Sequence, residues 1–300
     1  MPAADVPAVL GELRFGADAV YFEPRFPFVA GLSYTARFQL PGLPRLLRTF
    51  EVEAPSGERP RVTAVFPTAD TLPENALRLY VHFSQPMETR AARHVRLLDE
   101  QGSEIKDAFV AIFDGLWDPQ QTRLTLLFHP GRIKRGVGPG ETLGPPLREG
   151  GAYRLVVDGI QSARGMPLAA PFERRFRAAP ADRSSPRFED LRVSPPDRPD
   201  APLVVVFPEP LDEALLQRLV WVEDLAGGRV EGGVEIGANE TSWRFQPAQP
   251  WRAGEYAVRV HPALEDRAGN RFDRAFDRAA AARDQGAASV PRRIPVRITF

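Results

Sequence analysis

The side chains that most often perform catalysis or bind metals are scarce in this 300-residue chain. It contains no cysteine, which excludes disulfides, thiol catalysis, iron–sulfur clusters and cysteine-ligated zinc. Four histidines are present, His82, His94, His129 and His261, and no two have the spacing of a helical metalloprotease site. His82 and His261 occupy the polar phase of expected strands, where exposed imidazoles are readily accommodated. We therefore predict solvated histidines on a strand face.

Hard oxygen ligands are the one metal-binding chemistry that the sequence favours. Asp266 and Asn270 bracket a glycine-containing turn, and Glu265 is adjacent, a set of ligands that suits Ca²⁺. Calcium takes about six to eight oxygens, however, and Asp and Asn side chains also stabilise turns by bonding to their own backbone. We predict no cofactor and no metal, with Asp266 and Asn270 as the calcium candidate.

Nucleophilic and phosphate-binding motifs are incomplete. A nucleophile elbow needs Gly-x-Ser-x-Gly at a strand-to-helix turn, whereas the chain has Gly31-Leu-Ser33-Tyr-Thr35 within a strand pattern. The glycine-rich stretch 131–145 lacks Gly-Lys-Ser/Thr, and no helical pattern follows it. We predict that the protein is not an enzyme.

Surface recognition is the remaining chemistry. The stretch 131–145 is predicted to be a long loop on a rigid scaffold, where recognition residues are common, and it carries Arg132, Lys134 and Arg135. Trp117 has no repeated counterpart elsewhere in the chain, so it is either a sugar-stacking platform or a residue that packs beneath a turn. These four residues are the binding candidates.

Composition restricts the partners and the class of fold. Lys and Arg together number 39, and Asp and Glu together also number 39, so the formal charges balance. This balance argues against a nucleic-acid-binding surface. No apolar run reaches the length of a membrane helix, and the first residues show no signal peptide, which on its own predicts a cytoplasmic protein. With 31 prolines and 24 glycines, short strands joined by turns are expected instead of long helices.

Internal repeats organise these expected strands. A hairpin pattern that starts at Phe22-Glu-Pro and ends at Tyr34 recurs from Phe245-Gln-Pro to Tyr256, and again around 128–153 with the insertion 131–145. An opening strand recurs at 77–87 and 203–211, each time followed by a short helical stretch, 88–94 or 212–219. In the first opening strand, Leu79, Val81 and Phe83 alternate with Arg78, Tyr80 and His82, the period of a half-buried strand.

The repeat spacing of about a hundred residues is the size of one β-sandwich. We predict three units: a partial one at 1–57, a sandwich at 58–183 with the inserted loop 131–145, and a sandwich at 184–300. The partial unit lacks the opening strand, and half a sandwich leaves open edges and an uncovered apolar face. Either further residues precede it, or residues 8–57 are completed by packing on the second unit.

The combined pattern resembles bacterial immunoglobulin-like (Ig-like) domains of the S-layer-protein (SbsA-type) family. The resemblance covers Val193 to Asn270 nearly throughout, Phe83-Ser-Gln-Pro-Met87 in the second unit, and Phe22 to Phe38 in the first. It implies an all-β chain of tandem Ig-like antiparallel sandwiches, exported to the periplasm or cell surface. The implied function is a non-catalytic structural or adhesive module whose partner is a surface protein or glycan. The alternative is a carbohydrate- or peptide-binding accessory region of a surface enzyme.

Overall fold

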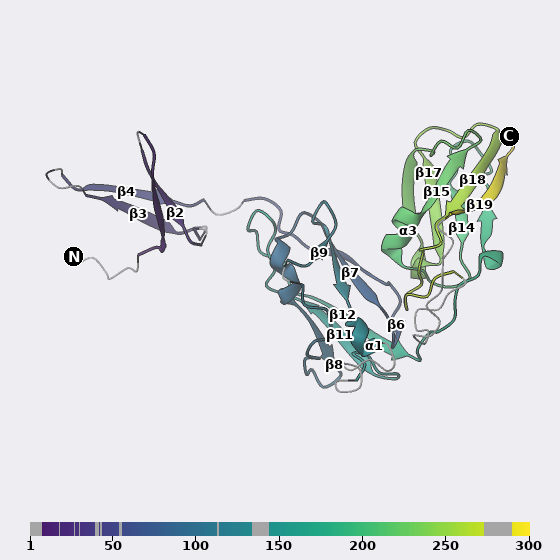
Figure 1. The fold of residues 1–300 in the computed structure, drawn as a ribbon, viewed down its shortest axis with the longest axis horizontal. Helices are drawn as coiled ribbons and strands as arrows, with labels where there is room; N and C mark the ends of the chain where they lie inside the picture. Colours follow the sequence, from purple (N-terminus) through teal and green to yellow (C-terminus); the bar gives the residue numbers. More distant parts are fainter. Residues whose placement is uncertain are drawn as a thin grey trace. The chain divides into compact units, whose positions relative to one another are not determined.

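The fold is described from a computed structural model of the chain (Figure 1). The described residues are 8–272 and 290–300, except 18, 27, 30, 40, 41, 43, 54, 55, 113 and 134–143. The chain forms two compact units, one of residues 1–59 with 164–166, the other of residues 60–163 and 167–300. Among the described residues, no helix combines the length and the apolar character needed to cross a bilayer.

The larger unit begins with two four-stranded sheets. The first has the order β5 (Val62–Phe66), β7 (Arg78–Phe83), β10 (Arg123–Leu127), β9 (Leu116–Trp117). The second has the order β6 (Thr71–Pro73), β12 (Phe172–Ala179), β11 (Ala152–Val157), β8 (Val95–Asp99). Neighbouring strands are antiparallel, apart from the parallel pair β6 and β12. Two short helical elements lie between strands: η1 (Thr89–His94) and α1 (Pro130–Ile133).

The second half of this unit has one sheet of four described strands and one of three. The first has the order β13 (Arg192–Ser194), β14 (Leu203–Val206), β17 (Ser242–Pro247), β16 (Gly232–Ile236). The second has the order β15 (Val220–Asp224), β18 (Gly254–Val260), β19 (Arg292–Ile298). The short helical elements are η2 (Phe188–Asp190), α3 (Glu213–Leu219) and η3 (Ala238–Glu240).

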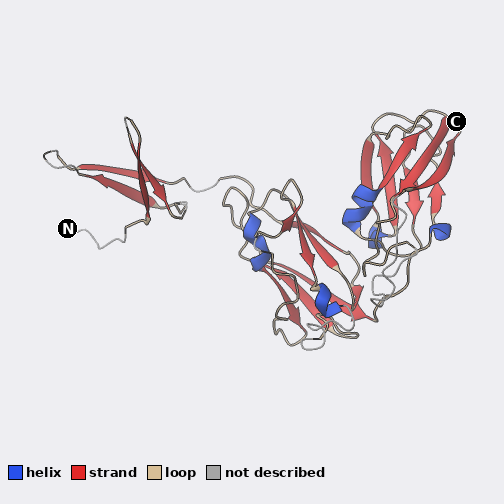
Figure 2. Ribbon diagram, in the orientation of Figure 1, coloured by secondary structure: helices blue, strands red, loops and turns tan. Residues whose placement is uncertain are grey.

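Both halves have the strand order of a constant-type Ig sandwich. In the letter code of Ig domains, strands A, B, E and D form one sheet and C, F and G the other. The order β13-β14-β17-β16 over β15-β18-β19 reproduces this arrangement, as does β5-β7-β10-β9 over β8-β11-β12. The all-β, Ig-like fold class predicted from the sequence is therefore confirmed, and Figure 2 shows how little of the chain is helical.

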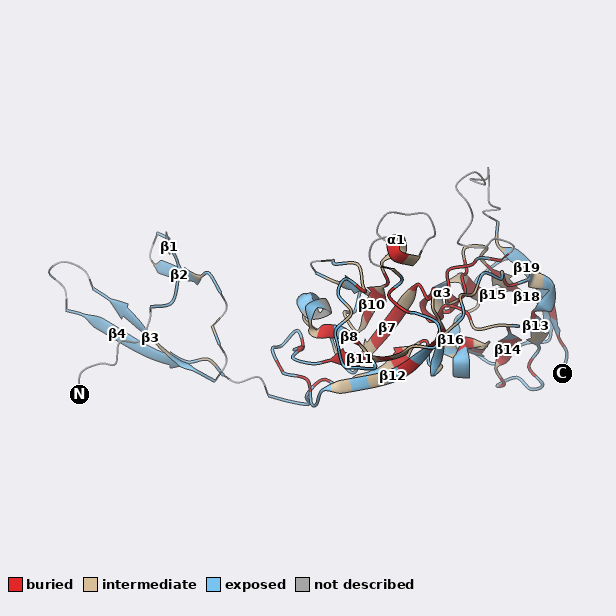
Figure 3. Ribbon diagram, turned by 90° about the horizontal axis from the view of Figure 1, so that it is seen from below, coloured by how far each residue is buried: buried red, intermediate tan, exposed pale blue. Residues whose placement is uncertain are grey.

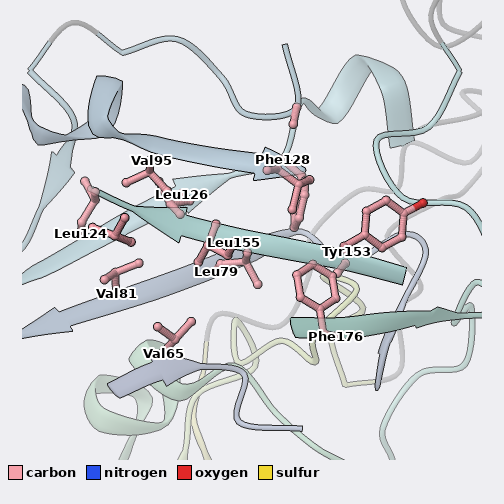
Figure 4. Close-up of a cluster of buried hydrophobic side chains, with 14 of the residues drawn as sticks. Val65, Leu79, Val81, Val95, Leu124, Leu126, Phe128, Tyr153, Leu155 and Phe176 are labelled. Carbon is pink, nitrogen blue, oxygen red and sulfur yellow. The ribbon is translucent and has the colours of Figure 1, made fainter. Parts of the chain in front are cut away.

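Each sandwich encloses one apolar core, built from the strand phases that the sequence indicated. On β7 the side chains of Leu79, Val81 and Phe83 are buried in this core. Figure 4 shows Leu79 and Val81 in one cluster with Leu155 of the facing sheet. The second core is centred on Trp243 and Phe245. Because buried apolar area is the main stabilising contribution to folding, these alternating residues determine which face of each strand points inward.

The helical stretches predicted after the opening strands take two forms. The second is the α-helix α3, which starts after Asp212, whose carboxylate accepts a hydrogen bond from the backbone amide of Leu215 at 3.0 Å. An Asp in this capping position satisfies an amide that the helix leaves free. The first stretch is the 3₁₀ element η1.

The smaller unit consists of two hairpins without a core. The first pairs β1 (Gly11–Phe15) with β2 (Val20–Pro24), and the second pairs β3 (Ser33–Phe38) with β4 (Leu46–Glu51). None of its described residues between 8 and 59 is buried, as the pale blue strands β1–β4 of Figure 3 show. Its two sheets have two strands each, which is fewer than a stable sandwich needs.

Candidate functional site

The polar face of β7 lies against the second sandwich. Arg78 reaches Asp212 at 3.0 Å through one guanidinium nitrogen and Glu265 at 2.8 Å through the other. The Tyr80 hydroxyl lies 2.7 and 2.8 Å from the two carboxylate oxygens of Asp212, to which it donates. The side chains that the alternation placed outside the first core are therefore covered by a neighbouring sandwich.

Local structure fixes the two acids that receive Arg78. Asp212 is the N-cap of α3, and its backbone amide donates to the carbonyl of Glu265 at 2.8 Å. Glu265 also accepts from the guanidinium of Arg271 at 3.0 Å. A backbone hydrogen bond from Leu77 to the carbonyl of Arg267, at 2.9 Å, joins the start of β7 to the same loop. The acids are thus held in place before any side chain of β7 contacts them.

Burial and neighbouring charges shift the pKa values of Asp212, Tyr80 and Arg78. Burial raises the pKa of Asp212, and the nearby Arg78 charge and the Tyr80 hydroxyl oppose that rise. Burial and the charge of Asp212 also raise the pKa of Tyr80, so its hydroxyl stays a donor. Burial alone would lower the pKa of Arg78, but the charges around it, that of Asp212 above all, outweigh burial. The net shift is upward, so the guanidinium stays charged. Arg78 and Asp212 therefore form a buried ion pair, and the Tyr80 hydroxyl supplies a further hydrogen bond to the carboxylate.

His82 does not face bulk solvent as the sequence pattern predicted. Its side chain is 26% exposed and its Nε2 lies 3.5 Å from the carboxylate of Glu213, a residue of α3 that is almost fully buried. The ring of Phe66 packs edge-on to the imidazole, with centroids 5.2 Å apart. The prediction failed because alternation separates the core face of a strand from its other face, while a neighbouring sandwich can cover that other face.

A second polar junction is centred on Glu240, which has no exposed surface. One of its carboxylate oxygens accepts from the backbone amide and the hydroxyl of Thr68, at 2.8 and 2.6 Å. The other accepts from Arg267. Thr68 belongs to the first sandwich and the other two residues to the second, so this carboxylate is satisfied only when the two sandwiches are together.

Three carboxylates meet where the connecting segment passes the second sandwich. Oxygens of Asp182, Glu209 and Asp266 all lie within 4.8 Å of one another. Burial and the charge of Asp182 raise the pKa of Glu209 to about 7. Burial also raises the pKa of Asp266 to about 7, with Asp182 adding to the rise while hydrogen bonds from Asn270 oppose it. Asn75 exchanges two hydrogen bonds with the backbone of Asp182, at 2.6 and 2.8 Å, which holds this segment against the first sandwich.

The calcium candidates Asp266 and Asn270 lie together and support a turn. One oxygen of Asp266 accepts from the amides of Ala268 and Asn270, both at 2.8 Å, and the other accepts from the Asn270 side chain at 2.7 Å. This is the self-bonded turn that the sequence offered as the alternative to a metal site. Calcium at these residues stays a prediction. Sequence reasoning missed Asp182 and Glu209 as partners of Asp266. Asp182 lies in the proline-flanked segment 179–186 that joins the two sandwiches, and Glu209 lies between two prolines at the end of the opening strand 203–211.

Two of the binding candidates, Trp117 and Arg132, lie on the first sandwich. The indole nitrogen of Trp117 donates to the carbonyl of Thr89 at 2.9 Å, and the ring packs on Phe83 with centroids 5.8 Å apart. Arg132 is buried, and its guanidinium donates to the carbonyls of Lys106, Asp107 and Gly144. This geometry favours packing roles for Trp117 and Arg132. Lys134 and Arg135 lie outside the described residues, so a binding role for the four candidates stays a prediction.

The remaining histidines act locally. In the part of the chain that the structure describes, His129 and His261 each accept a backbone amide two residues further on, at 3.2 and 3.1 Å. The third, His94, lies 3.8 Å from the carboxylate of Glu88. These contacts stabilise turns, and none of them joins a histidine to both an acid and a hydroxyl.

Comparisons with known proteins show only distant likenesses. No protein-family model matches the chain, and no curated protein matches it. A structure of the S-layer protein SbsC is similar at 11% identity and a TM-score of 0.29, over 68% of this chain and 23% of that one. Native alpha-2-macroglobulin from Escherichia coli, spanning domains MG0-NIE-MG1, is similar at 11% identity and a TM-score of 0.27, over 72% of each chain.

A third similar structure contains the FN1–FN3 domains of chicken CNTN1, at 10% identity and a TM-score of 0.23, over 96% of this chain and 85% of that one. The chain therefore spans about a quarter of the length of the SbsC structure that it matches. With scores this low, the fold assignment rests on the strand order of the two sandwiches.

Proposed function

We propose that the protein is a non-catalytic structural or adhesive module, in which the sandwiches 58–183 and 184–300 act together as one stiff spacer. The observation that carries this proposal is the buried network of Arg78, Tyr80 and Asp212. The charged side chains that could have formed a reactive site serve to join two sandwiches instead.

The interface resists separation for an electrostatic reason. Pulling the sandwiches apart leaves Asp212 and Glu265 without Arg78, and leaves Glu240 without Thr68. A shift of the sandwiches that keeps these acids buried would remove one partner from a buried pair, which costs about 3–5 kcal/mol because the remaining charge is uncompensated. Several such pairs side by side favour one arrangement of the two sandwiches over a flexible string.

The proposed setting is the periplasm or surface of a bacterial cell. Its support is the sequence pattern of 193–270, which resembles Ig-like domains of the S-layer-protein type. In that setting the module holds a neighbouring domain or an adhesive tip at a fixed distance from its attachment. The proposed partner is a surface protein or a glycan, and no cofactor is involved.

The absence of cysteine allows a direct test of stiffness by spin labelling. Gln101→Cys and Leu225→Cys place one label on each sandwich at exposed hairpin turns. Double electron–electron resonance should give one narrow distance distribution for this pair of labels. It should be as narrow as the distribution for a control pair within the second sandwich, Arg198→Cys with Leu225→Cys. A broad distribution between the sandwiches would refute the spacer proposal. Adding Arg78→Met to the first pair should broaden it.

A further inference from the structure

The two hairpins of the smaller unit have the pairing of strands D, E, F and G of an Ig sandwich. In β1 and β2, Gly11 lies opposite Pro24 and Leu13 opposite Phe22. In β16 and β17, strands D and E of the second sandwich, Gly232 lies opposite Pro247 and Val234 opposite Phe245. The register of glycine, proline and phenylalanine is the same in both.

The glycines at these positions have the same surroundings. A Cβ on Gly11 would overlap the carbonyl oxygen of Glu23 and the ring of Phe22. A Cβ on Gly232 would overlap the carbonyl oxygen of Gln246 and the ring of Phe245. In each case only glycine allows the phenylalanine ring to lie across the neighbouring strand, so the two hairpins share a detail that pairing alone does not require.

The second hairpin corresponds to strands F and G. Tyr34 lies opposite Phe50 in β3 and β4, as Tyr256 lies opposite Val296 in β18 and β19. The Tyr34 hydroxyl accepts from the amide of Val29 at 2.8 Å, five residues earlier. In strand F of the first sandwich, the Tyr153 hydroxyl accepts from the amide of Arg148 at 2.7 Å, with the same separation.

Strands A, B and C have no counterpart among the described residues of the smaller unit. In the second sandwich, β14 pairs antiparallel with β17, and β15 pairs antiparallel with β18. The corresponding edges of β2 and β3 are unpaired in the described structure, since each of these strands has one partner. Unpaired edges beside apolar side chains readily accept further strands.

The missing strands leave apolar side chains uncovered at equivalent positions. Phe22 is 42% exposed whereas Phe245 is 4% exposed. Phe38 is 44% exposed whereas its counterpart Val260 has no exposed surface. The exposed apolar set of this unit is Val9, Leu10, Leu13, Phe15, Val20, Tyr21, Phe22, Phe26, Val29, Leu32, Phe38, Leu46, Leu47 and Phe50. Exposed apolar side chains beside an unpaired strand edge are where further strands can pack.

We propose that this half-sandwich is completed by strands A, B and C, supplied by a segment of the same polypeptide N-terminal to β1. The two complete sandwiches show what covers such a face, because in both of them strands A, B and C directly precede strand D. The segment has the chemistry of β13–β15, with alternating apolar residues in its second strand, as Leu203 and Val205 alternate in β14. That second strand pairs with β2, and the third pairs with β3.

The first test is the covalent structure of the protein isolated from its native cells. Intact mass and N-terminal sequencing should show a polypeptide heavier than the 33.3 kDa of residues 1–300. The additional N-terminal residues should contain strand patterns like those of β13–β15. A native polypeptide that starts at Met1 or Pro2 overturns the proposal.

The second test is hydrogen exchange, which follows the protection of each strand. In a recombinant protein of residues 1–300, the amides of β2 and β3 should exchange at least about tenfold faster than in the native polypeptide. Those of β17 and β18 should exchange equally in both and serve as the internal reference. Equal protection of β2 and β3 in both proteins overturns the proposal. If the recombinant protein is then a dimer, a second copy covers the apolar face; if it is a monomer, residues within 1–300 cover it.

A pair of variants of the native polypeptide ties the effect to the apolar face. Phe22→Asp should return β2 to fast exchange, because a carboxylate at this position prevents the strands from closing over it. Leu225→Asp, at a side chain 75% exposed on a complete sandwich, should leave exchange unchanged in every strand. If both variants exchange like the unmodified native polypeptide, the face is not covered as proposed.

Discussion

Removing the positive charge from the centre of the interface tests whether that interface holds the two sandwiches together. Arg78→Met keeps the length of the aliphatic stem and removes the guanidinium that contacts Asp212 and Glu265. Both acids are almost fully buried, with side-chain exposures of 4% and 7%. After the substitution Glu265 keeps Arg271, whereas Asp212 keeps only neutral donors.

The size of the effect follows from the burial of these groups. Breaking a buried ion pair by removing one partner costs about 3–5 kcal/mol. The Arg78 side chain is 23% exposed, so water partly replaces it, and we expect the lower end, about 3 kcal/mol. A matched control is Arg198→Met, which removes an exposed pair with Asp200 and should cost no more than about 1 kcal/mol.

Urea unfolding of the two variants at pH 7, followed by tryptophan fluorescence, measures these changes. Asp212→Asn should recover part of the loss when it is combined with Arg78→Met, because it removes the orphaned charge and keeps a side chain able to cap α3. The loss should also shrink at low pH, where Asp212, whose pKa is raised by burial, becomes neutral. Equal costs for Arg78→Met and Arg198→Met would refute the reasoning.

Three further predictions concern single groups. Tyr80→Phe should lower the free energy of urea unfolding by about 1.5–3 kcal/mol, the range for a hydrogen bond to a charged group, whereas Tyr256→Phe, whose hydroxyl makes an exposed bond at 3.2 Å, should cost less. The pKa of Glu209 is raised to about 7, so its stabilising contribution is present at low pH and declines as the pH rises from the ordinary pKa of a glutamate through 7. The Tm of Glu209→Gln minus the Tm of wild type should therefore be larger at pH 8 than at pH 5. The same difference at both pH values would contradict this prediction. Trp117→Ala should lower Tm because the indole packs on the core, and neither wild type nor variant should bind on a glycan array; binding that the substitution abolishes would favour the carbohydrate-binding alternative.

The alternation of apolar residues, the internal repeats and the resemblance to Ig-like domains together predicted the fold class. Leu79, Val81 and Phe83 occupy every second position of β7, and this period alone orients the strand. Likewise, the short helical stretch predicted at 212–219 after the second opening strand corresponds to α3. These are local signals, and the structure follows them.

Long-range placement could not be predicted in the same way. The pattern of β7 shows that Arg78 and His82 point away from the core, but it contains no information about what lies beyond them. Contacts such as Thr68 with Glu240 join residues 172 positions apart that share no motif. The same limit explains why Asp182 and Glu209 were missed, since both lie near Asp266 in space but far from it in the sequence.

The junction at Glu240 has a consequence for how such a protein can evolve. Its two carboxylate oxygens are divided between the sandwiches, one bound by Thr68 and the other by Arg267. Recombination that exchanged the first sandwich for an unrelated one would leave one carboxylate oxygen of the buried Glu240 without the donors of Thr68, so the two sandwiches should be inherited together. Gene duplication or transfer is therefore expected to copy both sandwiches at once.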